Sequence, residues 1–325
     1  NLKIVHENLS DPAADEVTVQ VKAIGLNFAD IFAIWGLYSA TPEGFFIPGL
    51  EYAGVIEKVG KNVTNVKVGD RVMGITRFGA YTTHLNIDSR YVIPLPADWD
   101  FSIGAAYLVQ VLTAYYAMVK LGDMQKNYTV LIHSAAGGVG ILANRIAKKF
   151  AAFTIGTTGS PKKVDFIQNE LGYDAAIVRG KDFRQQLQNA LDGRELDLVM
   201  ECIGGEVLKI GYEELAPMRR MVVYGSARYA TPVDRPNPFK LIYKFLTRPK
   251  IDPQMMIEEN KGVLGFNLIH LYERSHIMHE MLQEISQLDI GKPYVGHEFS
   301  FSALPDAIRL FASGKTVGKV VIKVD

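Results

Sequence analysis

The sequence contains few residues that could form disulfides, thiolate metal sites or a charged binding surface. Only one of its 325 residues is a cysteine, Cys202, which excludes an internal disulfide and any four-thiolate metal site. The 35 Lys and Arg residues are balanced by 35 Asp and Glu residues, so a global basic field for nucleic acid is absent. No run of about 18 uninterrupted apolar residues occurs, and we therefore expect no membrane span.

The chain also lacks the marks of an exported or a disordered protein. Residues Asn1–Ile4 do not form the basic and then apolar run of a signal peptide, so a cytoplasmic, reducing compartment is the expectation. Hydrophobic residues make up 48% of the chain and charged residues 22%, which is typical of a globular protein with a sizeable core. At roughly 150 residues per domain, the length predicts about two domains.

The first hundred residues have the pattern of a compact β domain. Glu16–Ala23 alternates polar and apolar residues, as a half-buried strand does. Glycine and proline recur at short intervals up to Pro96, which predicts short strands joined by turns. A barrel-like β domain is the simplest structure with this pattern.

Beyond Asp100 the pattern changes to helices alternating with strands. A helix is predicted over Phe101–Leu121, which is rich in Ala, Leu, Val and Tyr and has no proline. Strands are predicted over Thr129–His133, Phe153–Thr157, Ala175–Arg179, Asp197–Cys202 and Met221–Tyr224. Helices are predicted between them over Ile141–Phe150, Lys162–Leu171, Phe183–Leu191 and Val207–Leu215. Such alternation predicts βαβ units and a parallel sheet.

A proline-rich insertion, Arg228–Asn260, interrupts this alternation. Within it, Arg235–Lys250 has cations at four-residue spacing and apolar residues on its other faces. This pattern predicts a short basic amphipathic helix that covers the cleft, contacts a second copy or lies weakly on an anionic membrane. After it we expect a strand at Val263–Leu268, helices at Ser275–Leu288 and Ala303–Ser313, and a final strand at Lys319–Val324.

The most informative motif is a glycine-rich turn, Ala135–Gly140, between a predicted strand and a predicted helix. Its A-x-G-x-x-G pattern in this context is typical of a dinucleotide-binding turn. Gly137 and Gly138 would let the backbone approach a pyrophosphate, and the helix N-terminus would offer free N–H groups. Gly140 would let the helix pack closely on the sheet. A glycine-rich turn that binds nothing is the alternative.

The residues after the second strand of this unit favour NADPH over NADH. An acidic residue at that position would bind the ribose 2′-hydroxyl of NAD. Here Thr157 is followed by Gly159, Ser160 and two lysines, of which Lys163 is the second. A hydroxyl and two cations suit a 2′-phosphate, although lysines in the first turn of a helix can also be simply solvated.

Several motifs together resemble the zinc-free quinone oxidoreductase branch of the medium-chain dehydrogenase/reductase superfamily. They span nearly the whole chain: Gly25–Asp30, Gly36–Tyr38, Pro48–Gly54, Val68–Val72, Gly79–Tyr81, Leu112–Tyr115, Ala135–Gly140 and Val317–Val321. Gly262–Leu268 and the insertion before it resemble the vesicle amine transport protein subgroup. The resemblance implies an α/β fold, with a GroES-like irregular β-barrel catalytic domain at 1–122 and 265–325 and a Rossmann NADP-binding domain with a parallel sheet at 123–264. It also implies a homodimer formed along the Val263–Leu268 strand.

The resemblance also implies the site residues. Tyr38 would line the substrate cleft and donate a hydrogen bond or proton, and Asn27 would lie beside the nicotinamide ribose unless it only caps a helix starting at Phe28. Zinc is not expected, because Asn27 and Leu50 stand where zinc-dependent members have Cys and His. Arg179 replaces a family tyrosine near the adenosine. The residues expected to bind the cofactor are Asn27, Thr113, Ala135, Gly137, Gly138, Val139, Gly140, Thr157, Ser160, Lys163, Arg179, Gly225, Ser226, Phe266, Asn267, Leu268 and Lys319.

These features predict a zinc-independent oxidoreductase that passes hydride from NADPH to a quinone or an α,β-unsaturated carbonyl. Such polarised acceptors need a hydrogen-bond donor near their oxygen rather than a metal. An enoyl-thioester reductase is one alternative. The other is a membrane- or vesicle-associated interaction protein that binds NADPH with little turnover.

Overall fold

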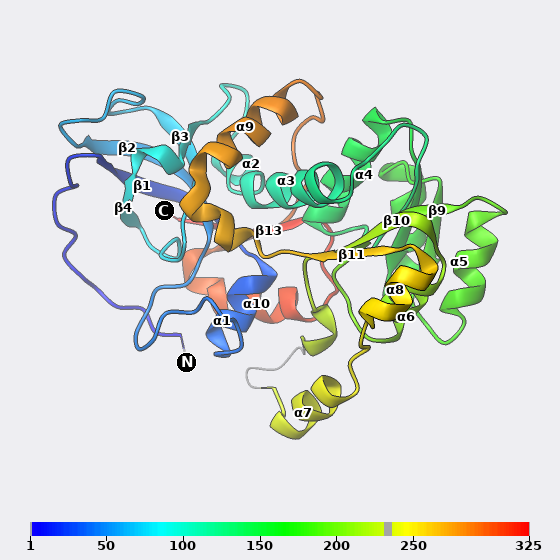
Figure 1. Cartoon of the computed structure of the whole chain (residues 1–325). Helices are drawn as coiled ribbons and strands as arrows, with labels where there is room; N and C mark the ends of the chain where they lie inside the picture. The colour runs from blue at the N-terminus through cyan, green and yellow to red at the C-terminus, as the bar shows by residue number, and fades with distance from the viewer. Residues whose placement is uncertain (1, 231–235, 325) are drawn as a thin grey trace.

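The computed structural model describes residues 2–230 and 236–324. The chain forms two β-sheets with helices packed between and around them (Figure 1). The first sheet, at the left of the figure, holds both ends of the described chain. The second sheet, at the right, is made entirely by the middle of the chain.

The first sheet has seven strands and an irregular, mostly antiparallel arrangement. Its main path runs β12-β13-β1-β2-β3-β5, and β4 also pairs with β1. Register shifts between β1 and β2 bend the sheet into the barrel-like form predicted for the first hundred residues. The strands are β1 Glu16–Gly25, β2 Glu51–Val59, β3 Arg71–Ile75, β4 His84–Asp88, β5 Val92–Pro94, β12 Val295–Ser300 and β13 Lys319–Lys323.

The second sheet is a six-stranded parallel sheet in the order β11-β10-β9-β6-β7-β8. The strand order reverses between β6 and β9, which is where such sheets bind ligands. β9 is buried along its whole length, as expected for a strand covered on both faces. The strands are β6 Thr129–Ile132, β7 Phe153–Thr158, β8 Ala175–Val178, β9 Leu196–Glu201, β10 Leu215–Val223 and β11 Gly262–Gly265.

The helices agree with the predicted order, although their boundaries move. The predicted helix at Phe101–Leu121 consists of α2 Phe101–Gly104, α3 Leu108–Tyr115 and a π-helical end, Tyr116–Leu121. Among the described residues it is the one stretch long and apolar enough to cross a membrane, but 72% of its apolar 18-residue window is buried inside the fold. The other α-helices are α1 Phe28–Ile34, α4 Gly138–Lys149, α5 Phe183–Leu191, α6 Glu206–Glu213, α7 Pro238–Leu246, α8 Pro253–Glu259, α9 Ser275–Ser286 and α10 Leu304–Ala312.

Several element boundaries differ from the prediction, and the largest shift is in β10, which begins at Leu215 rather than Met221. α4 begins at Gly138 rather than Ile141, because the glycine turn itself supplies the first helical residues. The helix predicted over Lys162–Leu171 is present, but it begins as a 3-10 turn and ends as a π-helix. The predicted strand at Val263–Leu268 ends at Gly265, and a 3-10 helix starts at Leu268.

The proline-rich insertion forms two exposed helices, and residues 231–235 within it lie outside the described residues. α7 is capped by Asn237, whose side chain accepts from the N–H groups of Phe239 and Lys240. It projects from the body of the molecule at the bottom of the view (Figure 1). β11, which follows the insertion, is an edge strand of the parallel sheet. The pairing of two copies along that edge, like the domain boundaries given above, stays a prediction.

Candidate functional site

A cleft of about 1180 Å³ lies between the two sheets and is lined by residues from both. It brings together residues that lie almost 300 positions apart. Of the predicted site residues, all but Ala135 and Ser160 line it: Asn27, Tyr38, Thr113, Gly137, Gly138, Val139, Gly140, Thr157, Lys163, Arg179, Gly225, Ser226, Phe266, Asn267, Leu268 and Lys319.

The glycine turn forms one wall of this cleft. Ser134 adopts the left-handed conformation (φ 54°) and reverses the chain after β6, and α4 then starts at Gly138. A Cβ atom at Gly140 would lie 2.6 Å from the Ser134 carbonyl oxygen, so only glycine allows this close packing. Ala135 itself does not line the cleft. The residue is fully buried and its N–H donates to the Thr157 carbonyl, so it supports the turn from beneath.

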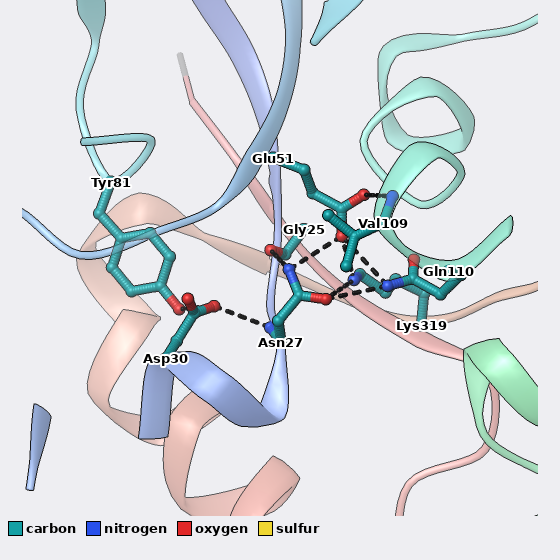
Figure 2. A network of polar contacts seen from close by, with 8 residues as sticks. All are labelled: Gly25, Asn27, Asp30, Glu51, Tyr81, Val109, Gln110 and Lys319. Atoms are coloured by element: carbon teal, nitrogen blue, oxygen red, sulfur yellow. Dashed lines mark hydrogen bonds and ion pairs between the residues drawn. The ribbon is translucent and has the colours of Figure 1, made fainter. Parts of the chain in front are cut away.

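A network of buried polar groups lies beside the turn (Figure 2). The Lys319 ammonium contacts both the Glu51 carboxylate and Asn27 Oδ1, the latter at 2.9 Å. Gln110 Nε2 donates to Asn27 Oδ1 at 2.9 Å and to Glu51 Oε1 at 3.2 Å, and the Val109 N–H donates to Glu51 Oε2. The Lys319 and Glu51 side chains are only 3% and 1% exposed. Burial lowers the pKa of Lys319, while the Glu51 carboxylate opposes that change.

Asn27 is therefore more than a helix cap. Its side-chain amide donates to Glu51 Oε1 at 2.9 Å, while its backbone N–H donates to the Asp30 carboxylate at 2.8 Å. The Tyr81 hydroxyl donates to the same Asp30 oxygen at 3.0 Å. Burial raises the pKa of Asp30 to about 7, although both hydrogen bonds oppose this. The start of α1 thus fixes Asn27 and places a fully buried carboxyl behind it (Figure 2).

Tyr38 lies at the cleft with a defined partner. Its hydroxyl donates to Asn267 Oδ1 at 2.7 Å, which joins a loop of the barrel to the segment that follows β11. Burial raises the pKa of Tyr38, so the phenol stays protonated at neutral pH. The lining of the cleft as a whole is partly apolar and aromatic and includes Phe28, Phe32, Leu50, Phe266 and Phe311.

Two cations lie at the other end of the cleft, where β7 and β8 end. The Arg179 guanidinium donates to Thr157 Oγ1 at 2.9 Å, and the Lys163 ammonium donates to the carbonyl oxygens of Gly314 and Thr316. Burial and the nearby Arg179 lower the pKa of Lys163. Within the described residues, neither cation has a carboxylate at ion-pair distance. Ser160 lies in the adjoining turn but does not reach the cleft lining.

A buried pair that sequence reasoning missed lies between these two ends. His133 and Glu201 follow directly on the paired residues Ile132 and Met200 of adjacent strands, and their side chains approach to 3.2 Å with no exposed surface. Burial raises the pKa of Glu201, but His133 and two backbone N–H groups outweigh it and hold that pKa below its usual range. Polar residues at the ends of neighbouring predicted strands were the signal that could have revealed this pair.

The cleft shows no ligand set for zinc. In the described residues, no group of three or more His, Cys, Asp or Glu side chains is placed to hold a metal ion. Leu50 lines the cleft as an apolar side chain, and the carboxylate of Glu51 is already bonded to an ammonium. Cys202 lies at the opposite side, 3.6 Å from Ser134 Oγ, and burial raises the pKa of its thiol.

Comparison with known proteins places the chain in a family. Residues 13–97 match the alcohol dehydrogenase GroES-like domain, and residues 138–286 match the domain described as zinc-binding dehydrogenase. The human synaptic vesicle membrane protein VAT-1 homolog is 30% identical over 315 residues, which is 96% of this chain and 79% of that protein. The chain spans only 64% of the length of the Danio rerio VAT-1 homolog.

Solved structures agree with this placement. The Escherichia coli quinone oxidoreductase, solved with NADPH, has a TM-score of 0.85 and 26% identity, covering 98% of this chain and 94% of that one. The CurK enoyl reductase has a TM-score of 0.83 and 27% identity, again over 98% and 94%. The chain therefore belongs to the medium-chain dehydrogenase/reductase superfamily of oxidoreductases, in the zinc-free quinone oxidoreductase branch that includes the VAT-1 homologues.

Proposed function

We propose that this protein is an NADPH-dependent, zinc-independent oxidoreductase that reduces quinones or α,β-unsaturated carbonyl compounds. The observation that carries the proposal is the cleft itself, which has a glycine turn in its middle and two cations, Lys163 and Arg179, at one end. A 2′-phosphate would accept hydrogen bonds from both cations, since guanidinium and ammonium groups bind phosphate strongly. The NADPH-bound Escherichia coli relative supports the choice of cofactor.

The residues present fit this cofactor along the whole cleft. The turn from Gly137 to Gly140 offers N–H groups and the positive end of the α4 dipole to a pyrophosphate. A Cβ atom at Gly138 would extend toward Gln110 and Lys319, so glycine keeps open the space between the turn and the polar network. Bound NADPH would supply the hydride. Lys319 and Asn27 would hold the ribose and phosphate groups nearest the reacting end.

At the acceptor end, the protein's part is to bind a flat molecule and stabilise charge on its oxygen. The aromatic wall formed by Phe28, Phe32 and Phe311 buries the apolar part of such a molecule. Tyr38 has a protonated hydroxyl held by Asn267, and it can turn that proton toward an acceptor oxygen where negative charge develops.

Titration with each cofactor tests the proposal. Wild-type protein should bind NADPH at least tenfold more tightly than NADH, because only NADPH carries the phosphate that faces Lys163 and Arg179. Lys163→Ala should lose most of this preference and leave NADH binding unchanged. Cofactor fluorescence measures both affinities. Lys162→Ala is the matched control, since the cleft is lined by Lys163 but not by its neighbour.

Turnover then distinguishes the alternatives. NADPH consumption is followed with a panel of quinones, enals and an enoyl thioester of coenzyme A. Reduction of quinones or enals supports the proposal, whereas reduction of the thioester alone would identify an enoyl-thioester reductase. That alternative is favoured by Arg228, which lines the cleft and whose buried Nη1 has no hydrogen-bond partner in the described residues. The ammonium of the α7 residue Lys244 donates to the backbone carbonyl of Arg228, so two cations lie at this position. A protein that binds NADPH tightly and reduces nothing would be an interaction protein.

The surface of α7 favours a membrane-associated role as a second candidate. Phe239 and Leu246 are 78% and 69% exposed, and the helix carries Lys240 and Lys244 but no acidic residue. Exposed apolar side chains beside cations bind anionic lipid surfaces.

Vesicle co-sedimentation measures this binding. Wild type should pellet with phosphatidylserine-containing vesicles at low salt, and a Phe239→Ser, Leu246→Ser variant should pellet several-fold less. Val68→Ser, which removes an exposed side chain on the barrel, is the control and should behave as wild type. Equal pelleting of the α7 variant and wild type would remove the membrane role.

A further inference from the structure

Four polar side chains form a row across the ends of four adjacent parallel strands. Glu201 ends β9, His133 follows β6, Thr157 lies near the end of β7, and Arg179 follows β8. The sheet order β9-β6-β7-β8 is also the order of these side chains. Glu201, His133 and Thr157 have no exposed surface, and His133, Thr157 and Arg179 are among the residues that line the cleft.

Each member of the row contacts the next. Arg179 Nη1 donates to Thr157 Oγ1 at 2.9 Å, and Thr157 Oγ1 lies 2.8 Å from His133 Nδ1. His133 Nε2 lies 3.2 Å from Glu201 Oε2. The other oxygen of Glu201 accepts from the N–H groups of Ile203 and Gly204, so the carboxylate is fixed by the chain that follows β9.

The proton positions give the row a direction. A guanidinium can only donate, so the Thr157 oxygen accepts from Arg179 and has its own proton left to give. His133 Nδ1 is placed to accept that proton. The other ring nitrogen, Nε2, lies 3.2 Å from Glu201 Oε2, which is ion-pair distance, but the two atoms do not form an aligned hydrogen bond. The hydrogen bonds of the row therefore join Arg179, Thr157 and His133, and Glu201 adjoins them as a charged neighbour.

The same geometry leaves Arg179 positively charged toward the cleft. The His133 and Thr157 side chains lie between the Glu201 carboxylate and the Arg179 guanidinium. The carboxylate therefore forms no ion pair with the guanidinium. Only one of the five N–H groups of Arg179 is held by Thr157, and its Nη2 lies beside Gly159, in the turn that leads to Lys163.

We propose that Glu201, His133 and Thr157 are positioning residues that hold the Arg179 guanidinium ready for a phosphate monoester, and that this row sets the preference for NADPH over NADH. The inference rests on the proposed function, because it assigns a role to residues at the proposed cofactor site. It predicts that a substitution in the row behind Arg179 alters recognition of the 2′-phosphate and of nothing else.

Thr157→Val tests the inference, because it removes the hydroxyl in the middle of the row and keeps the shape of the side chain. Its affinity for NADPH should fall about tenfold while its affinity for NADH stays within twofold of wild type. The same selective loss should appear for 2′,5′-ADP against 5′-AMP, which isolates the phosphate. Thr157→Ser keeps a hydroxyl and should retain the wild-type preference.

Thr154→Val is the matched control, since Thr154 is equally buried on β7 but bonds to Asp174 at the other end of the strand. It should leave the cofactor preference unchanged. A Thr157→Val protein with the wild-type preference, or one that loses NADPH and NADH affinity equally, would overturn the inference. A wild type that does not prefer NADPH would instead overturn the proposed function, so the two failures can be told apart.

Discussion

Replacing Lys319 with methionine should lower the free energy of unfolding by about 3–5 kcal/mol, because a buried carboxylate loses its only cation. The ammonium of Lys319 is the sole cation in contact with Glu51 in the described residues, and both side chains are almost fully buried. Gln110, Asn27 and the Val109 N–H would remain as partners, but none carries a charge. Urea unfolding measures the loss, and the fluorescence of the two tryptophans, Trp35 and Trp99, follows the transition.

Two further variants show whether the loss comes from the unpaired charge. Lys323→Met removes the next lysine on the same face of β13, an exposed residue paired with Glu298, and should cost less than 1 kcal/mol. Adding Glu51→Gln to Lys319→Met removes both charges and should recover most of the stability, as replacement of a whole buried ion pair often does. Equal costs for Lys319→Met and Lys323→Met would contradict this account.

The stability of the protein should fall as the pH rises from 5 to 8, by about 3 kcal/mol, because of Asp30. Burial raises the pKa of this carboxyl to about 7 in the folded protein, against about 3.9 in an unfolded chain. Between those two values the folded state holds a proton that the unfolded state has released. Stability is therefore greatest on the acid side of this window, falls with rising pH, and levels off above the folded pKa.

Asp30→Asn isolates this dependence. The amide does not titrate, so the difference in stability between wild type and variant should change by about 3 kcal/mol across the same pH range. Asp88→Asn is the control. Burial raises the pKa of Asp88, but hydrogen bonds from Arg90 lower it by more. Asp88 is therefore ionised throughout this pH range and does not contribute to the fall in stability. A wild-type profile parallel to that of Asp30→Asn would show that Asp30 is ionised throughout.

The architecture could be predicted from the sequence because it depends on local patterns. Alternating strands and helices after Asp100 determine a parallel sheet, and the strands predicted within it all occur, although β10 begins at Leu215 rather than Met221 and β11 ends at Gly265 rather than Leu268. α5 has the predicted bounds, Phe183–Leu191. Boundaries moved where two kinds of local structure compete, as at Gly138, where the binding turn and the helix share residues.

The polar contacts could not be predicted, since they depend on residues far apart in the chain. Lys319 and Glu51 lie 268 positions apart, and Tyr38 and Asn267 lie 229 apart. The sequence identified Lys319 as a cleft residue through its resemblance to a family, but nothing near it indicates a carboxylate partner. His133 was predicted only as the last residue of a strand. Its contact with Glu201 follows from the pairing of β6 with β9, which the sequence alone does not give.

The position of Lys319 also has a consequence for how the protein is made. β13 is the last strand in the described chain, and its neighbour Gly318 donates to the Ala136 carbonyl in the glycine turn. A chain emerging from the ribosome completes its parallel sheet well before this strand appears. Until then the carboxylate of Glu51 has no cation, and the turn lacks its support. The cleft is therefore completed only once β13 has emerged, and chains cut short before β13 should be recognised as unfinished by the cell's quality-control proteases.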